Sequence, residues 1–384
     1  MMETPYDAIV TFFVFNFGLV LSLLLSKWLK ISTKMGVFLY IWHTVFSFIY
    51  FNYILNYGGD AFDYYLKSLT IDNNETLQGY YLGSGMIVRL VEPFSSLLTM
   101  PFIAVNLLFN IFGSIGLLAF YASLMYAVGD RGKYGKILAR IIVLLPSISY
   151  WTSAVGKDSL FFMGVGLLLW SYISLRERLA YAITSLLIIF LVRPHMGGLI
   201  IASLVMSIFF KKNVNIAYRT AILASSLGLL FALFPYITKY VGLNDASSSS
   251  DVMEYIETRQ EYNQSGGGGI DISQMSYPMK MFTYMFRPLL NEAASFSSLM
   301  ASVDNTFILI VFCFGFYWFF KNNNVNKRNY YFLIIYGVLG WSILAMTTAN
   351  LGIAVRQKWM IIPFFFFVFL FSMYSYKKRL GFER

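Results

Sequence analysis

Long apolar stretches separated by short polar connections make up most of the chain. The hydrocarbon core of a bilayer is about 30 Å thick, so a helix of roughly 20 predominantly apolar residues crosses it. The pattern predicts an all-α polytopic membrane protein with about 11 transmembrane helices. The predicted spans are 8–26, 36–55, 101–128, 137–154, 159–175, 179–192, 197–210, 218–236, 306–320, 329–347 and 359–376.

The apolar run 179–210 carries Arg193, Pro194 and His195 near its middle. As one straight helix it would extend about 48 Å at 1.5 Å per residue, which exceeds the hydrocarbon core. Proline and paired glycines favour a tight reversal, so we expect two short crossings that meet at "RPHMGG". A single long kinked helix is the alternative.

Composition supports the membrane class and excludes a soluble domain. The chain is 58% hydrophobic and 12% charged, with a mean hydropathy of +0.63. The one cysteine, Cys313, cannot form an intrachain disulfide, and we expect it to pack inside an apolar span. The N-terminus has no basic region before its first span, so we expect that span to stay uncleaved.

Lysine and arginine concentrate in one set of connections, which predicts the orientation. Of 29 Lys/Arg and 19 Asp/Glu, 19 Lys/Arg and only 3 Asp/Glu lie in the segments 27–34, 129–140, 176–178, 211–219, 321–328 and 377–384. The positive-inside rule puts these segments in the cytoplasm. We therefore expect one integral membrane domain over 1–384, with the N-terminus outside, the C-terminus cytoplasmic, and outer loops at 56–100 and 237–305. The glycine run of the second loop predicts a hinge or lid.

Five of the ten outer Lys/Arg stand at the edges of spans, mostly beside residues that bend the backbone. Guanidinium groups bind phosphate in a bidentate manner, so such a set indicates a site for anions. The alternative is that some of them reach lipid headgroups or pair with the nearby acids Asp158, Glu92 and Glu292. The five are Arg89, Lys157, Arg193, Arg287 and Arg356.

Carboxylates and histidines supply the remaining candidate chemistry. Asp60 and Asp63 stand one helical turn apart in "YGGDAFDYY", among tyrosines that suit a polyol-binding surface. Two carboxylates are too few for a convincing metal site, so we predict none. His195 adjoins an outer arginine and is a candidate acid or base, or a structural residue. We expect His43, inside an apolar span, to be packed or hydrogen-bonded between helices.

Several patches resemble one family in their order along the chain. They are "GGDAFDYY", "LLPSISYWTSAVGKDSLFF", "FLVRPHMGG", "FRPLLNEAASFSSLMASVDN" and "ANLGIAVRQKWMIIPFF". Together they resemble the Wzy/EpsG-like bacterial polysaccharide repeat-unit polymerases of O-antigen, capsule and exopolysaccharide synthesis. The resemblance implies a glycosyltransferase with a GT-C-like architecture in the bacterial inner membrane. Such an enzyme polymerises oligosaccharide units carried on undecaprenyl pyrophosphate at the outer face of that membrane.

The resemblance also implies roles for particular residues. Cations would stabilise the pyrophosphate as it leaves, without a metal or another cofactor, and a base would activate the attacking hydroxyl. The partners would be a lipid-linked glycan donor and acceptor, membrane lipids and a chain-length regulator, with no nucleic acid. The implied base is one of Asp60, Asp158 and His195, pyrophosphate would bind Lys157, Arg193, Arg287, Arg356 and Arg89, and the glycan would bind Asp63, Tyr64, Trp151, Arg259 and Lys358.

Two other functions fit parts of the pattern. A flippase or transporter for a lipid-linked glycan would place ionisable groups near the midplane in pseudo-symmetric halves, whereas this pattern crowds them toward one rim. A GT-C transferase that uses a polyprenyl-phosphate sugar would depend on a metal, with Asp60 or Asp63 as base or ligand. The 237–305 loop carries Arg259 and Arg287 but no histidine, a departure from many members of the polymerase group.

Overall fold

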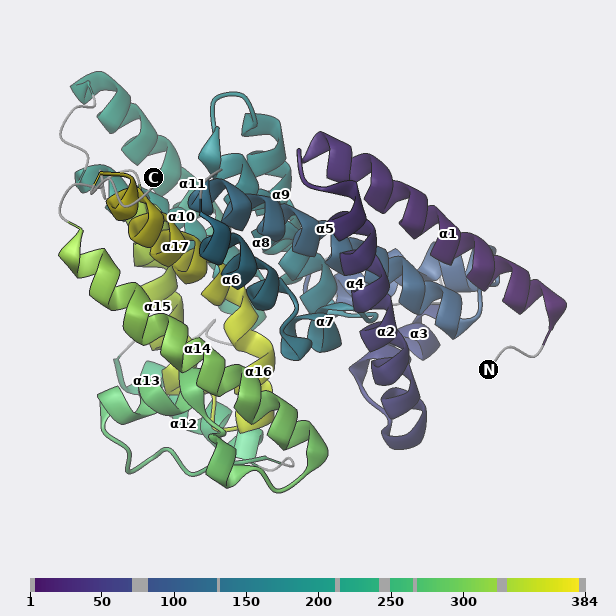
Figure 1. Cartoon of the computed structure of the whole chain (residues 1–384). Helices are drawn as coiled ribbons and strands as arrows, with labels where there is room; N and C mark the ends of the chain where they lie inside the picture. Colours follow the sequence, from purple (N-terminus) through teal and green to yellow (C-terminus); the bar gives the residue numbers. More distant parts are fainter. Residues whose placement is uncertain are drawn as a thin grey trace. The chain divides into compact units, whose positions relative to one another are not determined.

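The computed structural model describes residues 4–70, 82–129, 132–210, 215–241, 249–264, 268–322 and 330–379. This part of the chain is helical almost throughout (Figure 1), and the one β-bridge within it joins Gly269 to Asn350. The predicted all-α class is therefore confirmed. Contacts divide the chain into two compact units, which are described one at a time: residues 1–126 with 133–194, and residues 127–132 with 195–384.

Five described helices are long and apolar enough to cross a membrane. They are Pro5–Trp28, Thr33–Tyr57, Phe102–Val128, Arg219–Thr238 and Ser297–Lys321. Two bent helix pairs raise the number to seven if each pair counts as one span. A multi-pass helical membrane protein is thus supported, whereas the full count of 11 crossings stays a prediction.

The first unit is built around α5, the most deeply buried of these long helices. Gly116 on α5 and Gly166 on α8 let the two backbones approach closely, since a Cβ on Gly166 would lie 2.2 Å from the Gly116 carbonyl oxygen. The elements of this unit are α1 (Pro5–Trp28), α2 (Thr33–Tyr57), α3 (Asp60–Leu69), α4 (Ser84–Glu92), η2 (Pro93–Leu97), α5 (Phe102–Val128), α6 (Lys133–Val143), α7 (Pro146–Thr152), α8 (Lys157–Ile173) and α9 (Leu179–Val192).

The predicted span 137–154 is not one continuous helix. Helix α6 ends at Val143, and α7 starts again at Pro146, because proline lacks the N–H that would continue a helix and restricts the residue before it. Helix α7 then forms a broken pair with α8, bent by 120°. The break at Ser153–Gly156 puts irregular backbone inside the unit.

Buried polar side chains from α2 and α5 support this break. His43 Nδ1 lies 2.6 Å from Asn110 Oδ1, and His43 Nε2 lies 3.0 Å from Thr152 Oγ1. The Val155 N–H donates to Asn106 Oδ1, and Ser47 Oγ donates to the Ser153 carbonyl. Backbone that leaves a helix at membrane depth needs such partners, because no water is there to replace them. The prediction that His43 bonds between helices is confirmed.

Helices α8 and α9 form an antiparallel hairpin with two different ends. Trp28, Trp170 and Tyr181 meet at one end with ring centroids 4.3–5.8 Å apart, and Arg178 lies over Trp170 there. Aromatic rings with adjacent basic residues are typical of a membrane interface. Lys157 starts α8 at the other end, about 25 Å away along a 17-residue helix.

The run 179–210 is interrupted at one residue only. Helix α9 ends at Val192, Arg193 leaves the helical conformation, and α10 (Pro194–Phe209) begins directly after it. The glycines of "RPHMGG" lie inside α10, so the expected glycine turn is wrong. Pro194 explains the break, since it excludes the residue before it from helical backbone.

The second unit contains the rest of the chain. An aromatic cluster around Phe312 joins α14 to α15 and α17 through Trp341, Phe365 and Phe369. Cys313 is exposed on α14, so its expected packing role is wrong. Besides α10, the elements are α11 (Ile216–Val241), α12 (Ser249–Gln264), α13 (Tyr277–Phe286), η3 (Leu290–Glu292), α14 (Phe296–Lys321), α15 (Tyr331–Thr347), α16 (Leu351–Gln357), η5 (Lys358–Met360) and α17 (Ile362–Arg379).

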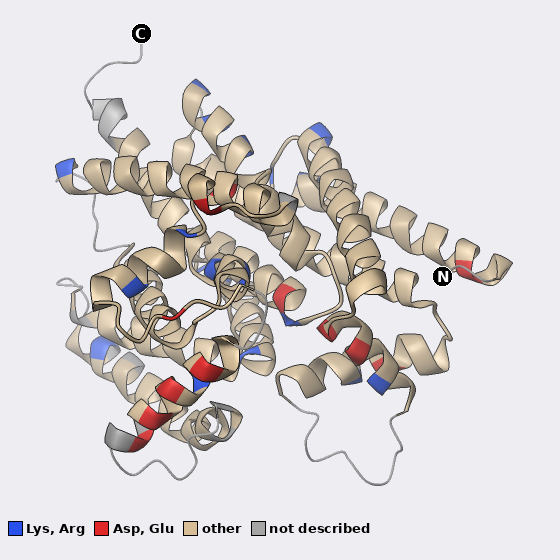
Figure 2. Cartoon of the chain, turned by 90° about the horizontal axis from the view of Figure 1, so that it is seen from below, with Lys and Arg blue, Asp and Glu red and all other residues tan. Residues whose placement is uncertain are grey.

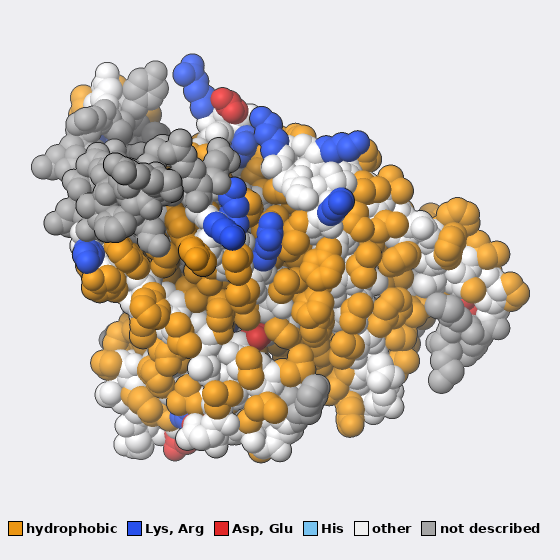
Figure 3. All heavy atoms as spheres, in the orientation of Figure 1, with side chains coloured by type: hydrophobic (Ala, Val, Ile, Leu, Met, Phe, Trp, Pro, Cys, Tyr) orange, Lys and Arg blue, Asp and Glu red, His pale blue; other side chains and the backbone are white. Residues whose placement is uncertain are grey.

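Apolar side chains cover much of the surface that is visible in Figure 3. On α14, Phe314, Tyr317 and Phe320 are each more than half exposed, and on α1 the same holds for Phe12 and Phe17. Exposed aromatic side chains on such helices suit contact with lipid. This surface agrees with the membrane class.

Helix α12 lies in the predicted outer loop 237–305 and carries a row of acidic residues (Figure 2). It is tied to α15, because Gln260 and Asn263 donate to the carbonyls of Met346 and Thr347. The end of the glycine run is also fixed, since the Leu351 N–H donates to the Gly268 carbonyl. Residues 265–267, which include the first glycines of the predicted hinge or lid, lie outside the described residues.

Candidate functional site

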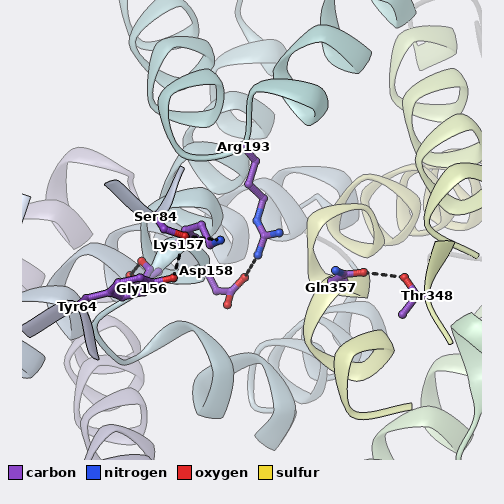
Figure 4. Close-up of polar contacts among 9 residues, drawn as sticks. Tyr64, Ser84, Gly156, Lys157, Asp158, Arg193, Thr348 and Gln357 are labelled. Atoms are coloured by element: carbon purple, nitrogen blue, oxygen red, sulfur yellow. Dashed lines mark hydrogen bonds and ion pairs between the residues drawn. The ribbon is translucent and has the colours of Figure 1, made fainter. Parts of the chain in front are cut away.

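Two helices of the first unit begin at a common point. Helix α4 starts at Ser84 after Gly83, and α8 starts at Lys157 after Gly156; neither has a side-chain cap among the described residues. The Lys157 ammonium donates to Ser84 Oγ over 3.0 Å (Figure 4). The first N–H groups of a helix have no partner within it, so both starts present N–H donors and a positive dipole end.

Glycine is required where α4 begins. Gly83 has φ +62°, a left-handed conformation that side chains disfavour, and its N–H donates to the Leu191 carbonyl over 2.8 Å. That bond ties the start of α4 to the end of α9. Tyr64 from α3 adds a hydrogen bond from its hydroxyl to Ser84 Oγ over 3.3 Å.

Arg193 and Asp158 form a buried ion pair at the same place. Arg193 Nη2 donates to Asp158 Oδ1 over 2.6 Å, and both side chains are only 10% exposed. Arg193 Nε is buried and finds no hydrogen-bond acceptor among the residues that the structure describes. A buried polar atom that lacks a partner is costly, and it marks a position where a ligand would be stabilised. We call Ser84, Lys157, Asp158 and Arg193 the α4–α8 junction.

The junction has the chemistry of an anion site. It combines two helix starts, an ammonium and a guanidinium with the Asp158 carboxylate. Asp158 orients the guanidinium through one nitrogen and leaves Nε available. Helix starts bind phosphate in many proteins through their first N–H groups.

The other predicted residues of the first unit lie near helix ends. Asp60 and Asp63 occupy the first turn of α3, directly after two glycines, and both are exposed. Arg89 is half-buried in the last turn of α4. Trp151 stacks edge-on against Tyr50 and belongs to an aromatic group on α2 and α7.

The second unit holds the remaining predicted residues. His195 stacks on Tyr240 with ring centroids 5.6 Å apart, and Arg259 lies exposed on α12 beside Tyr255. Arg356 is half-buried in the last turn of α16. On the same helix, Gln357 accepts a hydrogen bond from Thr348 (Figure 4).

Two predicted cations of the second unit are engaged in internal contacts. Arg287 Nε donates to Glu292 Oε1 over 2.8 Å, and this bond holds the pKa of Glu292 below its usual value. Lys358 is fully buried and donates to the Met285 carbonyl and to Asn305. Its predicted contact with the glycan does not fit this position, because its ammonium points into the unit.

Pairing with acids, the alternative for the outer cations, is confirmed for two of them. Arg193 pairs with Asp158, and Arg287 pairs with Glu292. Sequence reasoning missed Ser84 and Asn305 as site residues. The glycines around "LGSGM" were the available signal for Ser84, since they mark a helix start with close backbone approach.

Comparisons with known proteins add no relative. No protein-family model, curated protein or solved structure matches the chain. Across the described ranges, no three His, Cys, Asp or Glu side chains come together as a metal site. The geometry of the α4–α8 junction is therefore the observation that bears on function.

Proposed function

We propose that the chain is a membrane glycosyltransferase that polymerises oligosaccharide units carried on undecaprenyl pyrophosphate. The observation that carries the proposal is the α4–α8 junction. There the buried Arg193 keeps one nitrogen available beside Lys157 and two helix starts. This is the donor set that a diphosphate leaving group requires.

In the proposed reaction, a hydroxyl oxygen of the acceptor glycan bonds to the anomeric carbon of the donor. The bond from that carbon to the pyrophosphate oxygen breaks, and its electron pair stays on the pyrophosphate. Arg193 and Lys157 stabilise the negative charge that develops, by about 3 kcal/mol for each well-placed donor. The hydroxyl proton passes to a base, for which Asp60 and His195 are the candidates.

Asp158 is better suited to a positioning role than to that of the base. Its Oδ1 already accepts from Arg193, and its side chain is only 10% exposed. In the second unit, Arg287 and Arg356 are proposed to bind phosphate groups of lipid-linked substrates. The proposed location is the bacterial inner membrane, with the chemistry at its outer face.

The test is polymerisation by the purified protein. Wild type and Arg193→Ala are incubated with lipid-pyrophosphate oligosaccharide extracted from the host, with and without EDTA, and the products are sized on a gel. We expect a ladder from wild type that survives EDTA and that falls by about 100-fold or more in the variant. Arg176→Ala, an exposed arginine at the other end of the α8–α9 hairpin, is the matched control.

Two results would contradict the proposal and favour another function. If wild type makes no ladder but moves the same lipid across reconstituted vesicles, the chain is a transporter. If EDTA abolishes activity and a polyprenyl-phosphate sugar serves as the donor, the chain is a metal-dependent GT-C transferase.

A further inference from the structure

Lys358 is a fully buried lysine between α16 and α17. Its ammonium donates to the Met285 carbonyl over 2.9 Å and to Asn305 Oδ1 over 2.5 Å. Asp304, which is 1% exposed, attracts it electrostatically. Burying an ammonium is costly unless it is paired and hydrogen-bonded, so packing alone does not explain a lysine at this position.

Asn305, which accepts a hydrogen bond from Lys358, also binds the backbone that follows Arg287. Its Nδ2 donates to the Pro288 carbonyl over 3.0 Å. The carbonyls of Met285 and Pro288, which flank Arg287 in sequence, are therefore both held from inside the unit. Glu292 completes the loop, since it accepts from Arg287 and from the Leu289 N–H over 2.8 Å.

The same lysine fixes the end of α16. Arg356 stands two residues before Lys358, in the last turn of this helix. Asn350 caps the start of α16 by accepting from the N–H groups of Gly352 and Ile353. Both ends of the short helix that carries Arg356 are thus anchored within the second unit.

We infer that Lys358 and Asn305 are positioning residues, which form a brace that holds the Arg287 loop and the Arg356 helix at a fixed separation. The inference rests on the proposed function, in which these two arginines bind phosphate. In this inference Lys358 positions Arg287 and Arg356 and does not bind the glycan. Separating Lys358 from its partners would leave the buried charges of Lys358 and Asp304 without their counter-charges, which is strongly destabilising. The brace therefore holds the segments that it joins in one arrangement.

The structural test is a distance measurement that does not depend on activity. Spin labels are attached at Leu290→Cys and Ile353→Cys in a Cys313→Ser background, and their separation is measured by dipolar EPR. We expect a narrow distribution that broadens in Lys358→Met. It should stay narrow in Lys280→Met, a lysine change on α13 outside the brace. An unchanged distribution in Lys358→Met would overturn the inference.

Asn305→Asp provides a second variant if Lys358→Met does not yield folded protein. It keeps an acceptor for Lys358 and removes the donor to the Pro288 carbonyl, so the label distribution should broaden again. A distribution like that of wild type would overturn the brace equally well.

The polymer ladder separates this inference from the proposed function. Misplacing a substrate-binding group by about 1 Å costs on the order of 100-fold in rate, so Lys358→Met should lose about that much while Lys280→Met does not. If the distance distribution broadens in Lys358→Met and the ladder does not change, the role of Lys358 in the brace is supported. That result would instead contradict the phosphate-binding role of Arg287 and Arg356.

Discussion

At the scale of single residues, Arg193 illustrates what an apolar sequence can and cannot reveal. A charge inside an apolar run is unusual, and this alone marked Arg193 as a candidate. Its partner is less visible, because Asp158 lies 35 residues earlier and approaches only through the α8–α9 hairpin. The available Nε likewise depends on packing that no local pattern encodes.

Asp158 gives the sharpest test at this scale. Asp158→Asn keeps an oxygen that accepts from Arg193, so a positioning role predicts that the rate of ladder formation falls by about tenfold or less. Asp158→Ala removes the acceptor and leaves the guanidinium misplaced, for which we expect a loss on the order of 100-fold. Initial rates on the gel give both numbers. Equal and complete loss in the two variants would instead indicate that Asp158 is the base.

At the scale of elements, the helices were largely predictable and their interruptions were not. Each predicted span except 137–154 and 359–376 overlaps one helix, because the apolar pattern is strong over 14 or more residues. The span 359–376 starts in η5, and the chain bends by 56° before α17. The α7–α8 break depends on buried partners from α2 and α5, which are distant in sequence. The start of α4 was missed because it lies between two apolar spans, in a segment that the sequence described only as a loop.

The polar support of the α7–α8 break predicts a measurable loss of stability. His43→Leu removes the partner of Asn110 Oδ1, and an unsatisfied buried acceptor costs about 1–3 kcal/mol. Thr152 Oγ1 also loses its contact with His43 but still donates to the Ile148 carbonyl. We expect His43→Leu to unfold in detergent at a lower temperature than wild type, as monitored by circular dichroism. Phe48→Leu, an exposed change on the same helix, should have little effect. An unchanged transition in His43→Leu would contradict the supporting role.

The Arg287–Glu292 loop predicts a dependence on pH. The hydrogen bond with Arg287 holds the pKa of Glu292 below its ordinary value. The folded loop is therefore stabilised above the ordinary pKa of a glutamate and loses this contribution as the pH falls through the lowered pKa. A spin label at Leu290 should therefore stay ordered at pH 6 and become more mobile toward pH 3. Glu292→Gln should remove this response. The same response in the variant would show that another group is responsible.

At the scale of the whole molecule, the charge asymmetry of the sequence predicts which ends face the cytoplasm. Within the first unit, the Arg176–Arg178 connection and the α4–α8 junction lie at opposite ends of one hairpin. This arrangement is what the positive-inside prediction requires of these segments. The sequence could not predict the division into two units, since it depends on contacts between distant segments.

Accessibility in cells tests the orientation. In a Cys313→Ala background, Asp63→Cys should react with an impermeant maleimide applied to intact spheroplasts. Arg176→Cys should react only after permeabilisation, because the positive-inside rule places it in the cytoplasm. Both positions are exposed in the structure, so burial does not limit labelling. The reverse pattern would put the α4–α8 junction on the cytoplasmic side and exclude a polymerase of the proposed kind.

The proposed function requires that the α4–α8 junction binds the pyrophosphate of a lipid-linked glycan. Equilibrium binding of undecaprenyl pyrophosphate is measured for detergent-solubilised wild type, Arg193→Ala and Arg176→Ala. A charged hydrogen bond contributes about 1.5–3 kcal/mol, so the dissociation constant should rise by roughly 10- to 100-fold in Arg193→Ala and stay unchanged in Arg176→Ala. Equal binding by all three proteins would contradict the claim.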